Sequence, residues 1–355
     1  IVVRNLIGPD VGWRMVEPVR THADSGIIRG ILQELENLRA SRVLLPESGE
    51  KLDLQDFGLL PPRRSIIFGY AGRSWTLHLG DVSKDGGRLY VSRADQPDRV
   101  YVVPPAILPM TDLSVDDLRD KVVVSFSPDS PDQLVITPPT GPVVSLRKDA
   151  GVWSIIQPLR DTADPEAVRA LLAALAALRI EKGDFIRDEE GDLAEFGLDE
   201  PSFRIGLYAK GRGVTLLIGN PLKNNSTKLY AKRDEDPMVF ALAASRIAPL
   251  EVTVEDLRLT KALHFDPDTV TRLTVESEGT TVSLSQQGAT WKLDAPAGVE
   301  ADPNMVKLIL VGLANLRIEG RVDSPDPESV SRAGLNPPKM RVTIEAAGIA
   351  PQMLS

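Results

Sequence analysis

The sequence predicts an α+β fold made of tandem repeats of about 139 residues, each mainly antiparallel sheet with one long amphipathic helix and one short helix. Three observations predict it. A set of marker residues recurs along the chain, short β-branched runs come in groups separated by Gly, Pro and Asp turns, and a 3.6-residue apolar period follows the third run of each group. Because the strands come in runs and do not alternate with helices, the pattern favours α+β over a doubly wound fold.

The repeat is clearest around the tryptophans Trp13, Trp153 and Trp291, which are separated by 140 and 138 residues. In every copy a proline follows the tryptophan by five residues, and an Ala-Asp pair follows it by ten and eleven. These markers are Pro18, Pro158 and Pro296, and Asp24, Asp164 and Asp302. A unit of this length is a whole domain, since solenoid repeats have about 20–50 residues.

Further markers divide the chain into three copies. "FGLLPP" at 57, "FGLDEP" at 196 and "AGLNPP" at 333 match one another, and so do "SVDDLR" at 114 and "TVEDLR" at 253. The first set contains Phe57, Phe196, Gly58, Gly197 and Gly334. We expect a first copy at 1–120 without its leading strands, a complete middle copy at 121–260, and a third copy at 261–355 truncated at its C-terminus. The chain is therefore expected to be a fragment of a longer array.

The middle copy shows the elements expected of one unit. Three antiparallel strands are predicted at 132–138, 141–148 and 151–158, and the last ends at a proline, which cannot donate to a strand ladder. Asp164 is a suitable N-cap with Pro165 at the first helical position. The helix stripe is Val168, Leu171, Leu172, Leu175 and Leu178, matched in the first copy by Ile28, Ile31, Leu32, Leu35 and Leu38 and in the third by Val306, Ile309, Leu310, Leu313 and Leu316.

The second half of the unit follows the "FGL" turn. Strands are predicted at 204–209, 214–219, 228–233 and 238–242, and the short helix at 253–258 closes the unit. Thr253 with Asp256, like Ser114 with Asp117, fits a capping box. A strand tryptophan that faces an amphipathic helix packs under it more often than it stacks on a ligand. We therefore interpret Trp153 as a core residue between sheet and helix.

Composition excludes several classes of function. The net charge of -9 argues against a nucleic-acid partner, and the absence of cysteine excludes disulfides and thiolate zinc sites. No apolar run of about 18 residues exists that could cross a membrane. The histidines His22, His78 and His264 occupy non-equivalent positions, and the acidic runs at 187, 232 and 323 lack calcium-loop spacing. We predict no catalytic residue, cofactor or metal.

The ordered markers of the middle copy resemble the bacterial family of the domain of unknown function 4340. The matching residues are Trp153, Pro158, Asp164, Pro165, Val168, Leu171, Leu172, Leu175, Leu178, Phe196, Gly197, Leu198, Pro201, Ile218, Gly219 and Tyr230. The third copy departs from the pattern at Ala333, where phenylalanine is expected. The resemblance implies an N-terminal membrane anchor, an extracytoplasmic body and genes near those of auxiliary parts of gliding-type ABC transporters. It supplies no catalytic residues.

The expected function is that of a non-catalytic bacterial cell-envelope protein. It would be a periplasmic or surface-exposed array, tethered to the membrane by a segment outside this sequence, that binds or scaffolds a protein partner such as an ABC-transporter auxiliary complex. Two alternatives stay open. The first is a glycan- or peptide-binding module, and the second is an enzyme with an unrecognised acidic site. A cytoplasmic location also stays open.

Overall fold

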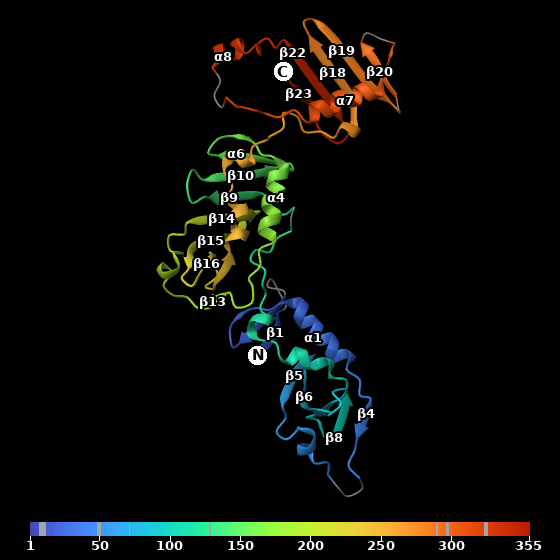
Figure 1. The fold of residues 1–355 in the computed structure, drawn as a ribbon, viewed down its shortest axis with the longest axis vertical. Coiled ribbons are helices and arrows are strands. Elements are labelled where there is room, and N and C mark those ends of the chain that lie inside the picture. Colours follow the sequence, from blue (N-terminus) through green and yellow to red (C-terminus); the bar gives the residue numbers. More distant parts are fainter. Residues whose placement is uncertain are drawn as a thin grey trace. The chain divides into compact units, whose positions relative to one another are not determined.

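A computed structural model describes residues 1–6, 12–47, 51–70, 72–127, 129–288, 290–295, 298–322 and 326–355 (Figure 1). Helices and several antiparallel sheets confirm the α+β class. The chain forms two compact units, one made of residues 1–127, 174–206 and 213–250 and the other of residues 128–173, 207–212 and 251–355. We name the sequence ranges 1–120, 121–260 and 261–355 the first, middle and third copies. That division stays a prediction.

The first copy contains two separate sheets. A three-stranded sheet has the order β1-β2-β3, with strands β1 (Val2–Leu6), β2 (Gly12–Glu17) and β3 (Thr21–His22). A five-stranded sheet has the order β4-β8-β7-β6-β5, with strands β4 (Arg42–Leu44), β5 (Arg64–Tyr70), β6 (Arg73–Val82), β7 (Leu89–Arg93) and β8 (Gln96–Val103). The helical elements are α1 (Ser25–Asn37), η1 (Leu54–Phe57), η2 (Pro105–Ile107), α2 (Leu108–Thr111) and α3 (Val115–Leu118).

The middle copy contributes one sheet with the order β12-β11-β10-β9-β14-β15-β16-β17-β13. Its strands are β9 (Gln133–Thr137), β10 (Val144–Asp149), β11 (Val152–Gln157), β12 (Asp161–Thr162), β13 (Phe185–Arg187), β14 (Phe203–Ala209), β15 (Arg212–Leu222), β16 (Asn225–Arg233) and β17 (Val239–Ala243). Its helical elements are α4 (Pro165–Ala176), η3 (Ala194–Phe196), α5 (Ala244–Ile247), η4 (Ala248–Leu250) and α6 (Val254–Leu257).

The third copy contains a six-stranded sheet with the order β21-β20-β19-β18-β22-β23. Its strands are β18 (Val270–Ser277), β19 (Thr280–Gln287), β20 (Thr290–Ala295), β21 (Glu300–Ala301), β22 (Met340–Ala346) and β23 (Gln352–Leu354). Its helical elements are η5 (Pro267–Thr269), α7 (Pro303–Ala314) and α8 (Pro327–Arg332). One core cluster joins α7 to this sheet through Trp291, Val306, Leu310, Leu273 and Ile344.

Most strong local patterns became the expected elements. The long helix begins after an aspartate in all three copies, and both short helices begin with a complete capping box. Many of the elements without a prediction are short, such as the two-residue strands β3, β12 and β21, strands β4, β13 and β23, and helices α2, α5 and α8. Such segments are too brief to show a hydrophobic period. The marker Pro296 lies outside the described residues.

The helix stripe is not equally buried in the three copies. In α4 and just after it, Leu171, Leu172, Leu175 and Leu178 are all buried. The predicted stripe residues Leu32 of the first copy and Ile309 and Leu316 of the third are exposed. Among the three copies, only the middle copy has all five stripe residues buried.

Candidate binding site

The three marker tryptophans occupy the same place in three strands. Trp13 pairs with Asn5, Trp153 with Lys148 and Trp291 with Gln286 in antiparallel register. The carbonyl oxygens of Trp13 and Trp153 accept hydrogen bonds from Ala23 N and Ala163 N, at 2.8 and 3.0 Å, just before the long helix. Trp153 and Trp291 are 8% and 7% exposed, while Trp13 is only half-buried. Trp13 is more exposed because it borders a groove in the first copy.

The three marker aspartates cap the long helices. Asp24 Oδ1 accepts from Gly26 N at 2.8 Å, Asp164 Oδ1 from Glu166 N at 2.8 Å, and Asp302 Oδ1 from Asn304 N at 2.9 Å. These bonds satisfy backbone donors that the first helical turn leaves without partners. Burial alone would raise the pKa of the Asp164 carboxyl. The N–H donors of Glu166 and Ala167 outweigh that effect, so the pKa lies below its ordinary value.

The "FGL" markers form a tight backbone crossing. Gly58, Gly197 and Gly334 all have positive φ, of 63°, 64° and 73°. A second glycine faces the turn, because a Cβ at Gly80 would lie 2.1 Å from the Phe57 carbonyl oxygen and one at Gly219 would lie 2.2 Å from that of Phe196. The Phe57 and Phe196 rings contact Tyr90 and Tyr230, with centroids 5.0 and 4.8 Å apart. These contacts give the markers a packing role.

The histidines have different local partners. His78 Nδ1 lies 2.9 Å from the Ser65 hydroxyl, and the main chain of His264 is bonded to the Gln352 side chain. Within the described residues, no group of His, Asp and Glu side chains could hold a metal ion.

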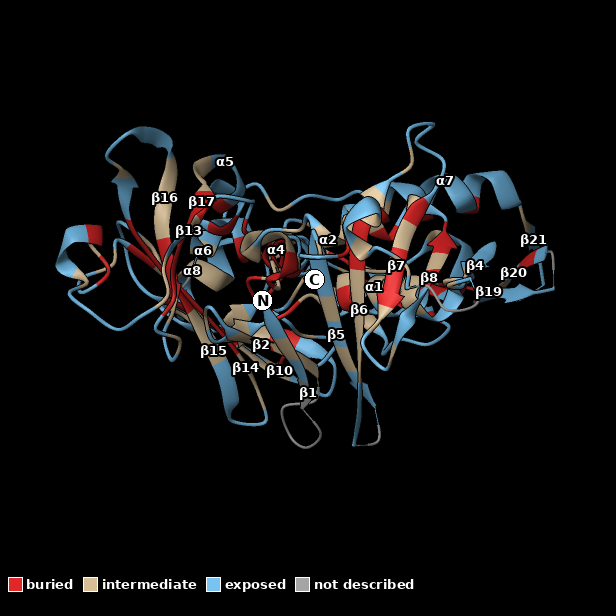
Figure 2. Ribbon diagram, turned by 90° about the horizontal axis from the view of Figure 1, so that it is seen from below, coloured by how far each residue is buried: buried red, intermediate tan, exposed pale blue. Residues whose placement is uncertain are grey.

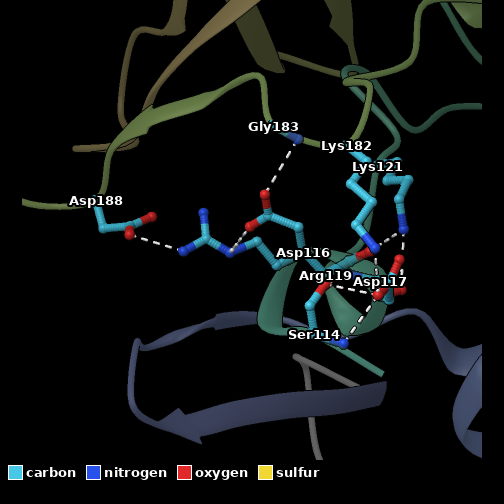
Figure 3. A network of polar contacts seen from close by, with 8 residues as sticks. All are labelled: Ser114, Asp116, Asp117, Arg119, Lys121, Lys182, Gly183 and Asp188. Atoms are coloured by element: carbon cyan, nitrogen blue, oxygen red, sulfur yellow. Dashed lines mark hydrogen bonds and ion pairs between the residues drawn. The ribbon is translucent and has the colours of Figure 1, made fainter. Parts of the chain in front are cut away.

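A polar network joins the end of the first copy to residues 182–188 of the middle copy (Figure 3). Arg119 follows helix α3 and is 4% exposed at its side chain. Its Nη2 donates to Asp188 Oδ2 at 2.7 Å, and its Nε lies 3.7 Å from Asp116 Oδ1. Its guanidinium also lies 4.4 Å from the centre of the Phe185 ring. The network thereby ties α3 to strand β13 and the residue that follows it.

The same network holds the loop before β13. Asp116 Oδ2 accepts from Gly183 N at 3.1 Å, and Asp117 Oδ2 accepts from Lys182 Nζ at 2.8 Å. The Lys182 ammonium, followed by the Ser114 hydroxyl and amide, holds the pKa of the Asp117 carboxyl well below its ordinary value. Each of these carboxylates is therefore already engaged with a cation or a backbone donor.

A related contact set follows the second short helix. Arg258 Nε donates to Asp161 Oδ2 at 2.7 Å, and Arg258 Nη1 donates to Glu255 at 3.1 Å. The residues at the end of each short helix also form backbone hydrogen bonds with two other segments. One segment is the start of the preceding long helix, and the other follows the next long helix along the chain. Asp24 N and Asp164 N donate to Leu118 O and Leu257 O, at 2.8 Å each, while Ile180 N donates to Lys121 O and Ile318 N to Thr260 O, at 2.8 and 3.0 Å. Both junctions therefore use one backbone scheme with different ion pairs.

An apolar groove of about 840 Å³ lies in the first copy, between the three-stranded and five-stranded sheets. Aliphatic and aromatic side chains supply most of its lining. They are Ile1, Val3 of β1, Trp13 of β2, Ile28, Ile31, Leu32 and Leu35 of α1, Ile66, Ile67 and Phe68 of β5, and Met110, Leu113 and Leu118. The arginines Arg4 and Arg64 also line it. Trp13 is half-buried because it borders this groove.

Two strand edges border the groove. Strand β1 pairs only with β2, and β5 pairs only with β6, within the described part of the chain. Figure 2 shows β5 without any buried residue along its length. Among the described residues, the groove therefore lies beside two strand edges that have no second neighbouring strand.

The family model of the domain of unknown function (DUF4340) matches the chain twice, at residues 13–161 and 153–338. The chain belongs to this family. The two matches confirm both the resemblance and the tandem arrangement of the domain. No curated protein sequence and no solved structure matches the chain. Among the helices of the described residues, none has the length and apolar character needed to span a bilayer.

Sequence reasoning found the framework and missed the groove and the junction. The framework markers lie in three places along the chain, and each has a local packing or capping role. The groove could not be read from any motif, because it depends on which strands have a neighbour. The junction had one signal, the arginine that follows "VDDL" and "VEDL" in both repeats.

Proposed function

We propose that this DUF4340 chain is a non-catalytic bacterial cell-envelope protein that binds or scaffolds a protein partner. It would lie outside the cytoplasm, tethered to the membrane by a segment that is not part of this sequence. The family membership and the tandem repeats support this proposal. An ABC-transporter auxiliary complex is the partner that the resemblance to this family implies.

The two matches of the DUF4340 family model, at residues 13–161 and 153–338, are the observation that carries the proposal. The groove of the first copy, about 840 Å³ in volume, is the candidate binding surface. Leu32 lies in this lining and is 39% exposed, although the matching leucine of the middle copy, Leu172, is 8% exposed. An exposed apolar groove bordered by polar backbone groups is a surface suited to a polypeptide partner.

The test is crosslinking in intact cells, with the natural full-length protein and two variants. Leu32→Asp places a charge in the groove. Leu308→Asp is the matched control, since Leu308 lies on the equivalent helix of the third copy and is 66% exposed. We expect the parent protein and both variants to be recovered in the envelope fraction. We expect the parent and Leu308→Asp to crosslink to one envelope protein, and Leu32→Asp to lose this crosslink. Cytosolic fractionation, or equal crosslinking by all three, would contradict the proposal.

A further inference from the structure

We infer that the hairpin between β15 and β16 carries a covalent modification site, at which a sugar is attached to the side-chain nitrogen Nδ2 of Asn225. The inference goes beyond the proposed function, because it concerns the middle copy and makes no use of the groove. It is carried by a sequence motif, by the exposure of the hairpin tip and by the hydrogen bonds within that tip.

The sequence contains the acceptor motif Asn-x-Ser/Thr in one stretch, "NNST" at 224–227. Here Asn224 has Ser226 two residues later, and Asn225 has Thr227. No other asparagine of the sequence is followed by a serine or a threonine at this distance. The motif is the acceptor of N-linked glycans and needs a surface position, because the attached group is bulky.

The motif lies at the tip of a tight hairpin. Leu222 of β15 pairs with Asn225 of β16, which leaves Lys223 and Asn224 as a two-residue loop. All residues from 223 to 227 are exposed. A group attached at this tip would therefore extend into solvent, and the core of the middle copy would not have to change.

Hydrogen bonds within the tip single out Asn225 as the acceptor. Its Oδ1 accepts from the Thr227 hydroxyl at 2.6 Å and from Thr227 N at 3.1 Å. These bonds form an Asx turn, in which an asparagine side chain bonds to the backbone two residues further on. The turn therefore places the hydroxyl of the motif on the side chain that would react.

The two donors of Thr227 act on the atom where negative charge would collect. A carboxamide nitrogen is a weak nucleophile, because its electron pair is shared with the carbonyl oxygen. Loss of a proton from Asn225 Nδ2 would move negative charge onto Oδ1, and donors already placed on this oxygen would stabilise that charge. Thr227 is thus a positioning residue that acts through Asn225.

The reaction needs a sugar that is activated as a glycosyl diphosphate. A bond forms between Asn225 Nδ2 and the anomeric carbon of the sugar, and the bond from this carbon to the diphosphate oxygen breaks. The electron pair of the broken bond leaves with the diphosphate, and the Nδ2 proton passes to a base of the transferring enzyme. Lipid-linked and nucleotide-linked sugars share this chemistry, and the attached glycan distinguishes them.

The matching hairpin of the first copy shows that the fold does not require an asparagine turn here. This hairpin joins β6 to β7, and Ser83 N donates to the Arg88 carbonyl oxygen at 2.8 Å. Asp85 closes it by accepting from the Ser83 hydroxyl and from the Arg88 guanidinium. It contains no asparagine. The motif is therefore a property of the middle copy and not of the shared framework.

The test is mass spectrometry of the natural full-length protein, purified from its own cells, on the peptide that holds residues 224–227. We expect a sugar on Asn225. Asn225→Asp keeps the Oδ1 acceptor and removes the Nδ2 nucleophile, so it should lose the modification completely. Thr227→Val removes the hydroxyl and should lose most of the modification, whereas Thr227→Ser keeps the hydroxyl and should retain it.

Asn224→Asp is the matched control, because it changes the neighbouring asparagine and leaves Asn225 and Thr227 in place. It should retain the sugar. A glycan equal in mass to the lipid-linked oligosaccharide of the same cells identifies a lipid-linked donor, and a single hexose identifies a nucleotide sugar.

Four results would each overturn the inference. They are an unmodified Asn225 in the natural protein, a sugar that persists in Asn225→Asp, a sugar that Asn224→Asp removes, and full modification of Thr227→Val. Thermal unfolding of every variant shows that a lost sugar does not result from a lost fold, since all four substitutions lie at exposed positions of the hairpin tip.

Discussion

The first and middle copies share one framework and differ in how far it is closed. Both have the tryptophan strand, the aspartate cap, the left-handed glycine and the short capped helix. In the middle copy a single sheet contains β9 between β10 and β14, whereas the first copy has two sheets and a groove. The comparison teaches that the framework markers specify local geometry. The way in which the strands join into sheets is set outside these markers.

The largest expected effect is at the tryptophans, and it separates the two copies. Trp153→Ala removes a side chain that is 8% exposed and should destabilise the middle copy by about 3–5 kcal/mol. Trp13→Ala should destabilise the first copy by less, about 1–2 kcal/mol, because Trp13 is half-buried at the groove. Hydrogen exchange of β10 and β11 against β1 and β2 measures each change locally. Equal destabilisation by the two substitutions would contradict the predicted dependence on tryptophan burial.

The next effect should be the same in both copies, since it concerns the shared framework. Gly219→Ala and Gly80→Ala would each place a Cβ near 2 Å from a phenylalanine carbonyl oxygen, so the backbone must shift. We expect each to cost about 1–3 kcal/mol, as other overpacking substitutions do. Gly30→Ala is the control, because a Cβ there meets nothing within 4 Å. Thermal unfolding measures all three, and a neutral result at Gly219 would contradict the close crossing.

The smallest effect concerns the caps, and it is dependent on pH. Asp164→Ala should lower stability by about 1 kcal/mol at neutral pH. The folded-state pKa of the Asp164 carboxyl lies below the ordinary value of about 3.9, so its charge stabilises the fold above that pH. This contribution is lost as pH falls below about 4 towards the folded-state pKa. Asp164→Asn retains a capping side chain and should show a smaller loss of stability between pH 6 and pH 3.

Denaturant midpoints across this pH range test the cap prediction. The same acid response in the parent and in Asp164→Asn would show that the Asp164 charge does not contribute.

The elements that sequence predicted are those whose cause is local. Asp164 with Pro165, and Thr253 with Asp256, predict where two helices begin, because each pair lies within four consecutive residues. The Arg119–Asp188 pair joins residues 69 apart, and nothing near either residue marks its partner. The groove is less visible still. Val3, Leu32 and Ile66 look like ordinary core residues in the sequence, yet Leu32 is exposed and Val3 and Ile66 are only half-buried.

The two junctions have a consequence for how long such a chain can be. Each linker pairs backwards with the start of its own long helix and forwards with the end of the next one, through the same backbone bonds. The same backbone hydrogen bonds can therefore form at any junction between two units. A unit can be inserted or removed between two short capped helices without inventing a new interface, and only the neighbouring ion pairs need to change. Copy number in this architecture is thus a variable that gene duplication can adjust in whole units.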